Sequence, residues 1–133
     1  GKATWDTASW DEGAYELRAV ASDGPSNPSA EGLETDATLP NLLRVDRTPP
    51  SIEAKRRGRD IEAVVADALS GVARLEVVTD GHVVFSPRSA DGVCENNRET
   101  FLFAASTIAP GGTWSLRATD AAGNAVEAPV PAP

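Results

Sequence analysis

Apolar and polar residues alternate with a period of two along much of the chain. In the segment 14–23, every second residue from Tyr15 to Ala21 is apolar, and most of the residues between them are charged or polar. This alternation is typical of a β-strand with one buried face. Similar patterns predict further strands at 41–46, 51–54, 60–67, 72–79, 82–85, 100–104, 113–120 and 125–130. No segment shows a helical period, so the sequence predicts an all-β fold.

Residues that favour turns separate the predicted strands. Asp80-Gly81 stands between two β-branched runs and is a strong hairpin signal. The segments 24–39 and 87–97 are rich in Gly, Pro, Ser, Asn and acidic residues, and we expect both to be long polar loops. After Pro50, turn signals every ~8–12 residues separate about seven strands, which predicts a β-sandwich of roughly 80 residues.

Two consecutive prolines, Pro49 and Pro50, divide the chain. They fix φ and remove two backbone donors, so no β-ladder continues through them. The residue before a proline favours extended backbone, and we therefore expect a stiff connector at 45–50. The sequence predicts a first unit at 1–48 and a complete sandwich at 49–133.

A short internal repeat relates the two units. Residues 13–19 (Gly-Ala-Tyr-Glu-Leu-Arg-Ala) match residues 112–118 (Gly-Thr-Trp-Ser-Leu-Arg-Ala) in register. Tyr15 then corresponds to Trp114, in the penultimate strand of a sandwich, and core packing is the plain interpretation of both rings. The first unit is predicted to be the C-terminal half, the last three strands, of the same fold.

Half a sandwich exposes an apolar sheet face and an open strand edge, and both are unfavourable in water. Three arrangements remain open. A front half has been cut away, another chain supplies the missing strands, or the half-module packs on the second unit. We favour the first arrangement because the partial unit begins abruptly at Trp5.

The chain is acidic, with a formal net charge of −8 and a pI near 4.5. This balance argues against a nucleic-acid partner, because 12 Lys and Arg against 20 Asp and Glu leave no cationic surplus to neutralise phosphates. No apolar run approaches the ~20 residues that a membrane-spanning helix needs, so we expect no membrane insertion. Nothing near Gly1 resembles a signal peptide. Cys94 is the only cysteine, which excludes a disulfide within the chain.

Candidate catalytic groups are few. His82 is the only histidine, and it follows a turn without a partnered Cys or Ser motif. Cys94 stands among acidic residues, which raise a thiol pKa instead of lowering it. The sequence contains no nucleophile elbow, phosphate-binding loop or zinc-ligand spacing. We expect no enzymatic activity and assign no catalytic residue.

Three motifs resemble those of tandem Ig-like or fibronectin III-like modules in large exported bacterial proteins. They are Trp-Asp-Thr at 5–7 with the strand that follows it, Val-Asp-Arg-Thr-Pro-Pro at 45–50, and Ala-Thr-Asp-Ala-Ala-Gly-Asn-Ala at 118–125. Such modules occur at the C-terminal end of β-propeller or repeat proteins and in adhesins. The resemblance implies an Ig-like or fibronectin III-like sandwich and an extracellular, cell-surface or periplasmic location. It implies no particular activity.

The adhesins among these relatives bind Ca²⁺ between modules through linker and turn aspartates. Carried over, the resemblance implies Asp46 and Asp120 as ligands, with Asp23 as the equivalent residue of the first unit. Calcium takes about six to eight oxygen ligands, and carboxylates with backbone carbonyls supply some of them. The alternative is structural, with Asp120 capping backbone amides in a turn that Asn124 completes.

The sequence therefore favours a non-catalytic structural spacer or interaction module. Its expected partners are other domains of its parent protein and, for the first unit, a chain or fragment that supplies the missing strands. The alternative function is binding of carbohydrate or a cell surface. For that function Trp10, which stands in a turn, is the candidate ligand-binding residue, whereas Trp5 is expected in a strand core.

Overall fold

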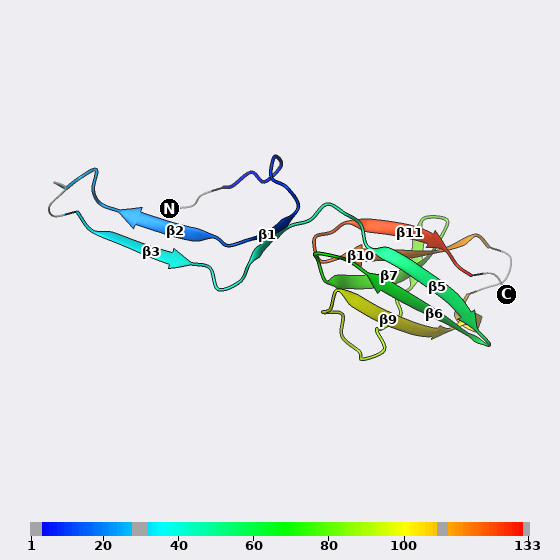
Figure 1. Cartoon of the computed structure of the whole chain (residues 1–133). Coiled ribbons are helices and arrows are strands. Elements are labelled where there is room, and N and C mark those ends of the chain that lie inside the picture. Colours follow the sequence, from blue (N-terminus) through cyan, green and yellow to red (C-terminus); the bar gives the residue numbers. More distant parts are fainter. Residues whose placement is uncertain (1–3, 28–31, 109–111, 132–133) are drawn as a thin grey trace. The chain divides into compact units, whose positions relative to one another are not determined.

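Figure 1 shows the computed structural model of the chain, which describes residues 4–27, 32–108 and 112–131. The chain divides into two compact units, Gly1–Val45 and Asp46–Pro133. Strands make up nearly all of the regular structure. The one helical element of the described residues is a 3₁₀ turn, η1 (Ala105–Thr107). The prediction of an all-β fold is confirmed.

The second unit is a sandwich of two antiparallel sheets. One sheet has the order β5 (Ser51–Arg57), β6 (Asp60–Ala66) and β9 (Arg98–Ala104). The other has the order β11 (Ala125–Pro129), β10 (Trp114–Asp120), β7 (Val72–Thr79) and β8 (His82–Phe85). Each strand of this unit was predicted, and their arrangement in two sheets confirms the predicted sandwich.

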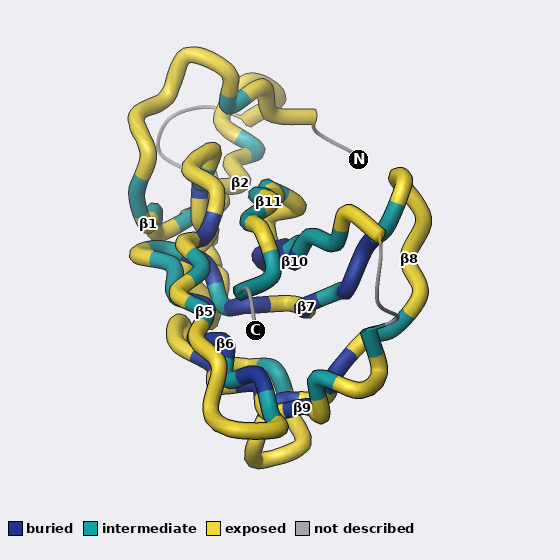
Figure 2. Tube along the Cα trace, turned by 90° about the vertical axis from the view of Figure 1, so that its right-hand side faces the viewer, coloured by how far each residue is buried: buried dark blue, intermediate teal, exposed yellow. Residues whose placement is uncertain are grey.

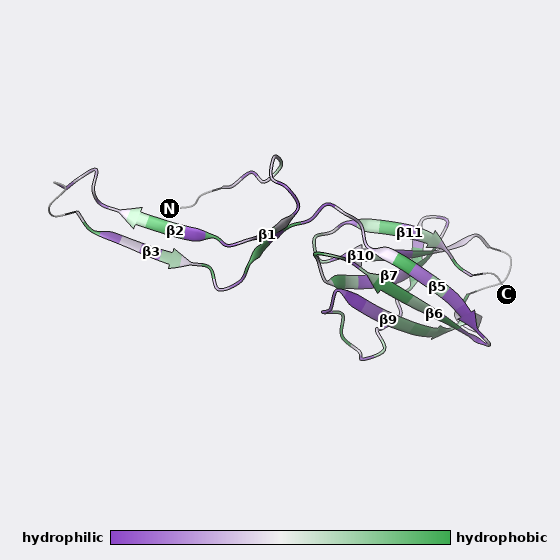
Figure 3. Ribbon diagram, viewed as in Figure 1, coloured by the Kyte–Doolittle hydropathy of each residue, from purple (hydrophilic) through white to green (hydrophobic). Residues whose placement is uncertain are grey.

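The inner faces of the two sheets form the core. Every second residue of β6 is buried, because this strand lies in the middle of its sheet and turns one face to the opposite sheet. Phe101, Leu75 and Leu116 have 0% exposure and come from three different strands. Buried positions alternate with exposed ones in Figure 2, and β6 is mainly hydrophobic in Figure 3. The alternation in the sequence therefore corresponds to burial in the sandwich.

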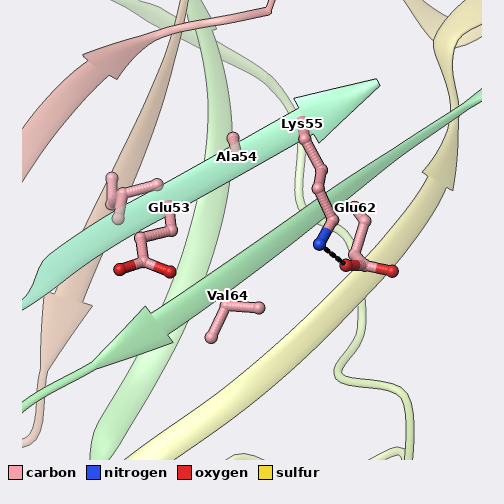
Figure 4. Close-up of a pocket in the computed structure, with 6 residues that line it drawn as sticks. Glu53, Ala54, Lys55, Glu62 and Val64 are labelled. Atoms are coloured by element: carbon pink, nitrogen blue, oxygen red, sulfur yellow. Dashed lines mark ion pairs between the residues drawn. The ribbon is translucent and has the colours of Figure 1, made fainter. Parts of the chain in front are cut away.

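The outer face of β5 and β6 carries a small charge cluster. Lys55 Nζ lies 2.9 Å from Glu62 Oε1, and Arg57 Nε lies 2.6 Å from Glu62 Oε2. Figure 4 shows the Lys55–Glu62 pair beside Val64, over a shallow depression in this face. The hydrogen bond from Lys55, followed by the bond and charge of Arg57, holds the pKa of Glu62 below its ordinary value of 4.5.

This ion pair predicts a pH effect on stability. A carboxyl group whose pKa is lowered by folding stabilises the folded state above the unfolded-state pKa, and this contribution is lost as the pH falls through the folded-state pKa. We expect Glu62→Gln to lower the urea midpoint of unfolding slightly at about pH 7 and to match wild type at about pH 2. An equal gap between the two proteins at both pH values would contradict this assignment.

The β7–β8 connection is the predicted two-residue hairpin. Asp80 has φ of 50° and Gly81 has φ of 80°, so both central residues lie in the left-handed region. Turns with two positive φ values match the twist of the flanking strands and favour Asp-Gly. The hairpin signal in the sequence is thus confirmed.

The first unit is a β-ribbon made of two pairs of antiparallel strands. Its strands are β1 (Gly13–Tyr15), β2 (Arg18–Ser22), β3 (Glu34–Thr38) and β4 (Leu43–Val45), and β1 pairs with β4 while β2 pairs with β3. The expectation of a loop throughout 24–39 was wrong, since β3 lies within it. β3 lacks apolar alternation, and its five residues are all exposed.

The two faces of this ribbon differ in polarity. Directly paired residues share a face, which places Tyr15 with Leu43 and Ala19 with Ala37. Leu39 donates its backbone N–H to the carbonyl of Leu17 at 2.8 Å, which extends this apolar face along the ribbon. The opposite face carries the ion pair between Arg18 Nε and Asp36 Oδ2, at 2.8 Å. Of the described residues of this unit, Val45 alone is buried.

Candidate metal centre

Three aspartates meet at one end of the second unit. Asp67 follows β6, Asp120 ends β10, and Asp46 precedes β5. One carboxylate oxygen of each residue lies within 4.8 Å of the others. The topology explains the meeting, because the start of β5 pairs with the end of β6 and the end of β10 pairs with the start of β7.

Asp67 is held by the turn between β6 and β7. Its Oδ1 accepts hydrogen bonds from the backbone N–H groups of Leu69, at 2.8 Å, and Ser70, at 2.7 Å. Its own N–H donates to the carbonyl of Asn97 at 2.8 Å. These bonds fix both the backbone and one carboxylate oxygen of Asp67 at the edge of the site.

Asp120 is the most buried of the three aspartates, with 2% exposure. Asn124 donates from its backbone N to Oδ1 at 2.8 Å and from its side-chain Nδ2 to Oδ2 at 2.9 Å. Gly123, with φ of 95°, closes this turn in a conformation that favours glycine. Asp120 thus caps backbone in a turn, as the structural alternative expects, and it also lies in the carboxylate cluster.

Asp46 carries the unusual feature of the site. Its Oδ1 accepts a hydrogen bond from the N–H of Thr48 at 3.1 Å. Its Oδ2 is buried and accepts no hydrogen bond from the described part of the chain. Burying a carboxylate oxygen without a partner is unfavourable, and two neighbouring carboxylates increase the cost. A cation bound between the three side chains would offset both costs.

The donor set suits a hard divalent cation. Carboxylate oxygens are the ligands that Ca²⁺ and Mg²⁺ take in proteins, whereas zinc sites more often use His and Cys. Asp46, Asp67 and Asp120 are the residues that would hold the ion. Water and backbone carbonyls would complete a shell of about six to eight oxygens for calcium.

The sequence pointed to two of these three residues. Asp46 and Asp120 lie together, whereas Asp23 lies in the first unit, in the turn between β2 and β3. There Asp23 Oδ1 accepts from the N–H of Leu33 at 2.6 Å, and Oδ2 accepts from Asn27 Nδ2 at 2.8 Å. Among the described residues, no carboxylate cluster includes Asp23. Asp67 was missed, although it shares with the other two a position at a strand end.

Trp10 belongs to an aromatic cluster at the start of the first unit. Its ring meets those of Trp5 and Tyr15 edge to face, with centroids 4.5 and 5.0 Å away. The hydroxyl of Tyr15 donates to the carbonyl of Asp11 at 2.7 Å. Trp5 and Trp10 are 37% and 39% exposed, so Trp5 does not lie in a strand core. Ligand binding by Trp10 stays a prediction.

Cys94 lies in the loop before β9, close to buried Glu99. Burial, followed by the negative charge of Glu99, raises the pKa of the Cys94 thiol. Glu99 Oε1 accepts from the backbone N–H groups of Glu95 and Asn96, at 3.1 and 2.9 Å, and so orders this loop. A raised pKa disfavours the thiolate, so the surroundings of Cys94 do not activate it as a nucleophile.

Comparison with protein-family models, curated proteins and solved structures finds no significant match. Within the part of the chain that the structure describes, no helix has the length and hydrophobicity that crossing a bilayer requires.

Proposed function

We propose that the chain is a non-catalytic structural module of a larger exported bacterial protein, in which a divalent cation fastens the linker to the second unit. The cation is Ca²⁺, held by Asp46, Asp67 and Asp120. Its role is mechanical, because it fixes the linker that leads into the first strand of the sandwich. The stiff prolines at positions 49 and 50 extend this fixed segment to β5.

One observation carries this proposal, the buried Oδ2 of Asp46 that no described group satisfies. One carboxylate oxygen of Asp46 lies within 4.8 Å of one oxygen of Asp67 and one of Asp120. Surface carboxylates often cluster without an ion, but water and cationic side chains then share their charge. Here Asp120 is 2% exposed, so water contributes little to its neutralisation. A bound cation supplies the missing partner.

Calcium is expected to raise the melting temperature of the second unit. A ligand that binds only the folded state stabilises it by about 2.7 kcal/mol at a hundred-fold excess over its Kd. Scanning calorimetry in EDTA and in excess CaCl₂ measures the shift. Asp67→Asn should remove most of the shift because it removes one anionic ligand.

Asp80→Asn is the matched control. It makes the same chemical change at an exposed aspartate in the β7–β8 turn, where asparagine also tolerates positive φ. This variant should retain the full calcium shift. If calcium leaves the melting temperature of the wild type unchanged, the proposed cation site is wrong.

The first unit supports the interaction part of the function. Leu17 and Leu116 occupy equivalent positions of the internal repeat, yet Leu116 is buried in the sandwich core while Leu17 is only half-buried. In the second unit, β7 pairs with the edge of β10, and the opposite sheet packs on the core side of β10. We therefore propose that strands equivalent to β5–β9, from another part of the parent protein, cover the apolar face of the first unit.

A further inference from the structure

The Asn124 side chain joins the linker to the turn after β10. Nδ2 of Asn124 donates to Oδ2 of Asp120 at 2.9 Å and to the backbone carbonyl oxygen of Asp46 at 3.2 Å. Asp46 and Asn124 are 78 positions apart in sequence, so the second bond is a tertiary contact. Both acceptors belong to residues of the carboxylate cluster.

Backbone bonds hold the remainder of the site without this amide. The N–H of Asp120 donates to the carbonyl of Asn124 at 3.0 Å, and the N–H of Gly123 donates to the carbonyl of Asp120 at 3.2 Å. The N–H of Ala121 donates to the carbonyl of Gly71 at 2.8 Å, which ties this turn to the turn between β6 and β7. The two turns that carry Asp67 and Asp120 are therefore joined directly by backbone, whereas the Asn124 side chain joins the carbonyl of Asp46 to them.

We propose that Asn124 is the positioning residue of the metal centre. Its amide holds Asp46 beside the other two carboxylates when no cation is bound, so the site is formed before the ion arrives. The inference rests on the cation site proposed above. A side-chain amide has two N–H groups and satisfies two acceptors at once, here a carboxylate and a linker carbonyl. Alanine satisfies neither acceptor, and an ionised aspartate side chain has no hydrogen to donate.

Without the amide, we expect only the calcium-bound protein to hold the linker beside the other two aspartates. Without a cation, the mutual repulsion of the carboxylates is no longer opposed by the Asn124–Asp46 bond, and the linker leaves the cluster. Calcium then has to order the linker as it binds, and this ordering weakens binding. Groups that orient metal ligands typically change metal affinity by about 10–100-fold when they are removed, and we expect a loss in this range for Asn124→Ala.

The test compares wild type with Asn124→Ala and Asn124→Asp in the full chain. Asn27→Ala is the matched control, because Asn27 Nδ2 donates to Oδ2 of Asp23 at 2.8 Å with the same four-residue spacing. Hydrogen exchange of the Thr48 backbone amide, which donates to Asp46 Oδ1 at 3.1 Å, is measured in EDTA and in CaCl₂ and reports the linker. Isothermal titration calorimetry reports calcium affinity. Asn124→Asp keeps the side-chain shape but adds a carboxylate that can itself bind calcium, so this variant reports only linker release in EDTA if the alanine variant does not fold.

The expected result is a linker protected in ion-free wild type, released in both Asn124 variants, and protected again when Asn124→Ala is saturated with calcium. A merely structural role would lower stability equally with and without the ion and leave the affinity unchanged. An ion-free Asn124→Ala protein with a protected linker overturns the inference. Calcium binding by Asn124→Ala within about twofold of wild type does so too, while the site itself stands. If wild type binds no calcium, the cation site fails, and linker release in EDTA then shows Asn124 to be a clamp on the linker alone.

Discussion

Replacing Phe101 by alanine is expected to lower the free energy of unfolding of the second unit by about 3–5 kcal/mol. Phe101 has no exposed surface, and its ring lies in the core formed by β6, β7, β9 and β10. Truncation removes the buried ring and leaves a cavity that the two sheets can fill only in part. A domain of this size has a total stability of only about 5–15 kcal/mol, so the variant should be close to unfolding. Urea unfolding followed by circular dichroism measures the loss.

Leu102→Ala is the control for Phe101→Ala. Leu102 is the next residue of β9, but its side chain points outward and is 56% exposed. Surface substitutions usually change stability by less than about 0.5 kcal/mol, and we expect the change in Leu102→Ala to stay below this bound. A comparable loss in both variants would mean that both faces of β9 are buried, contrary to the alternating burial pattern of this strand.

The strands of the second unit could be predicted because its apolar residues alternate where the sheet has one buried face. β6 is a clear case, since Ile61, Ala63 and Val65 are buried and the residues between them are not. β3 could not be predicted in this way. Its sequence from Glu34 to Thr38 holds a single apolar residue, Ala37, and the strand exists through its backbone pairing with β2. Pairing of this kind leaves no periodic signal in one strand alone.

The candidate site was predictable only in part, for a topological reason. Asp46 and Asp120 stand in motifs that resemble known modules, whereas Asp67 stands in an ordinary turn sequence. Its position becomes evident only when β5 and β6 pair and bring their ends together. The role of Asn124 is equally hidden, because its contact with the carbonyl of Asp46 crosses 78 positions. Both features depend on which strand ends share one end of the sandwich.

The internal repeat provides a second large prediction, a contrast between two equivalent leucines. Leu116→Ala is expected to destabilise the second unit by about 2–5 kcal/mol, because Leu116 is fully buried in the core. Leu17→Ala should change the stability of this chain by less than about 1 kcal/mol, because the described strands of the first unit leave this face uncovered. Urea unfolding of the two variants measures the contrast.

The same contrast should appear in backbone dynamics and should disappear in the proposed parent protein. A two-stranded ribbon without a covered face is marginally stable in water, so the amides of β2 and β3 should exchange far faster than those of β6 and β9. If strands of a parent protein cover the ribbon, as proposed, these amides should become protected there and Leu17→Ala should become costly. If Leu17→Ala already costs as much as Leu116→Ala in the chain alone, the face is covered without those strands. Light scattering then shows whether a second copy covers it, and completion by the parent protein is wrong.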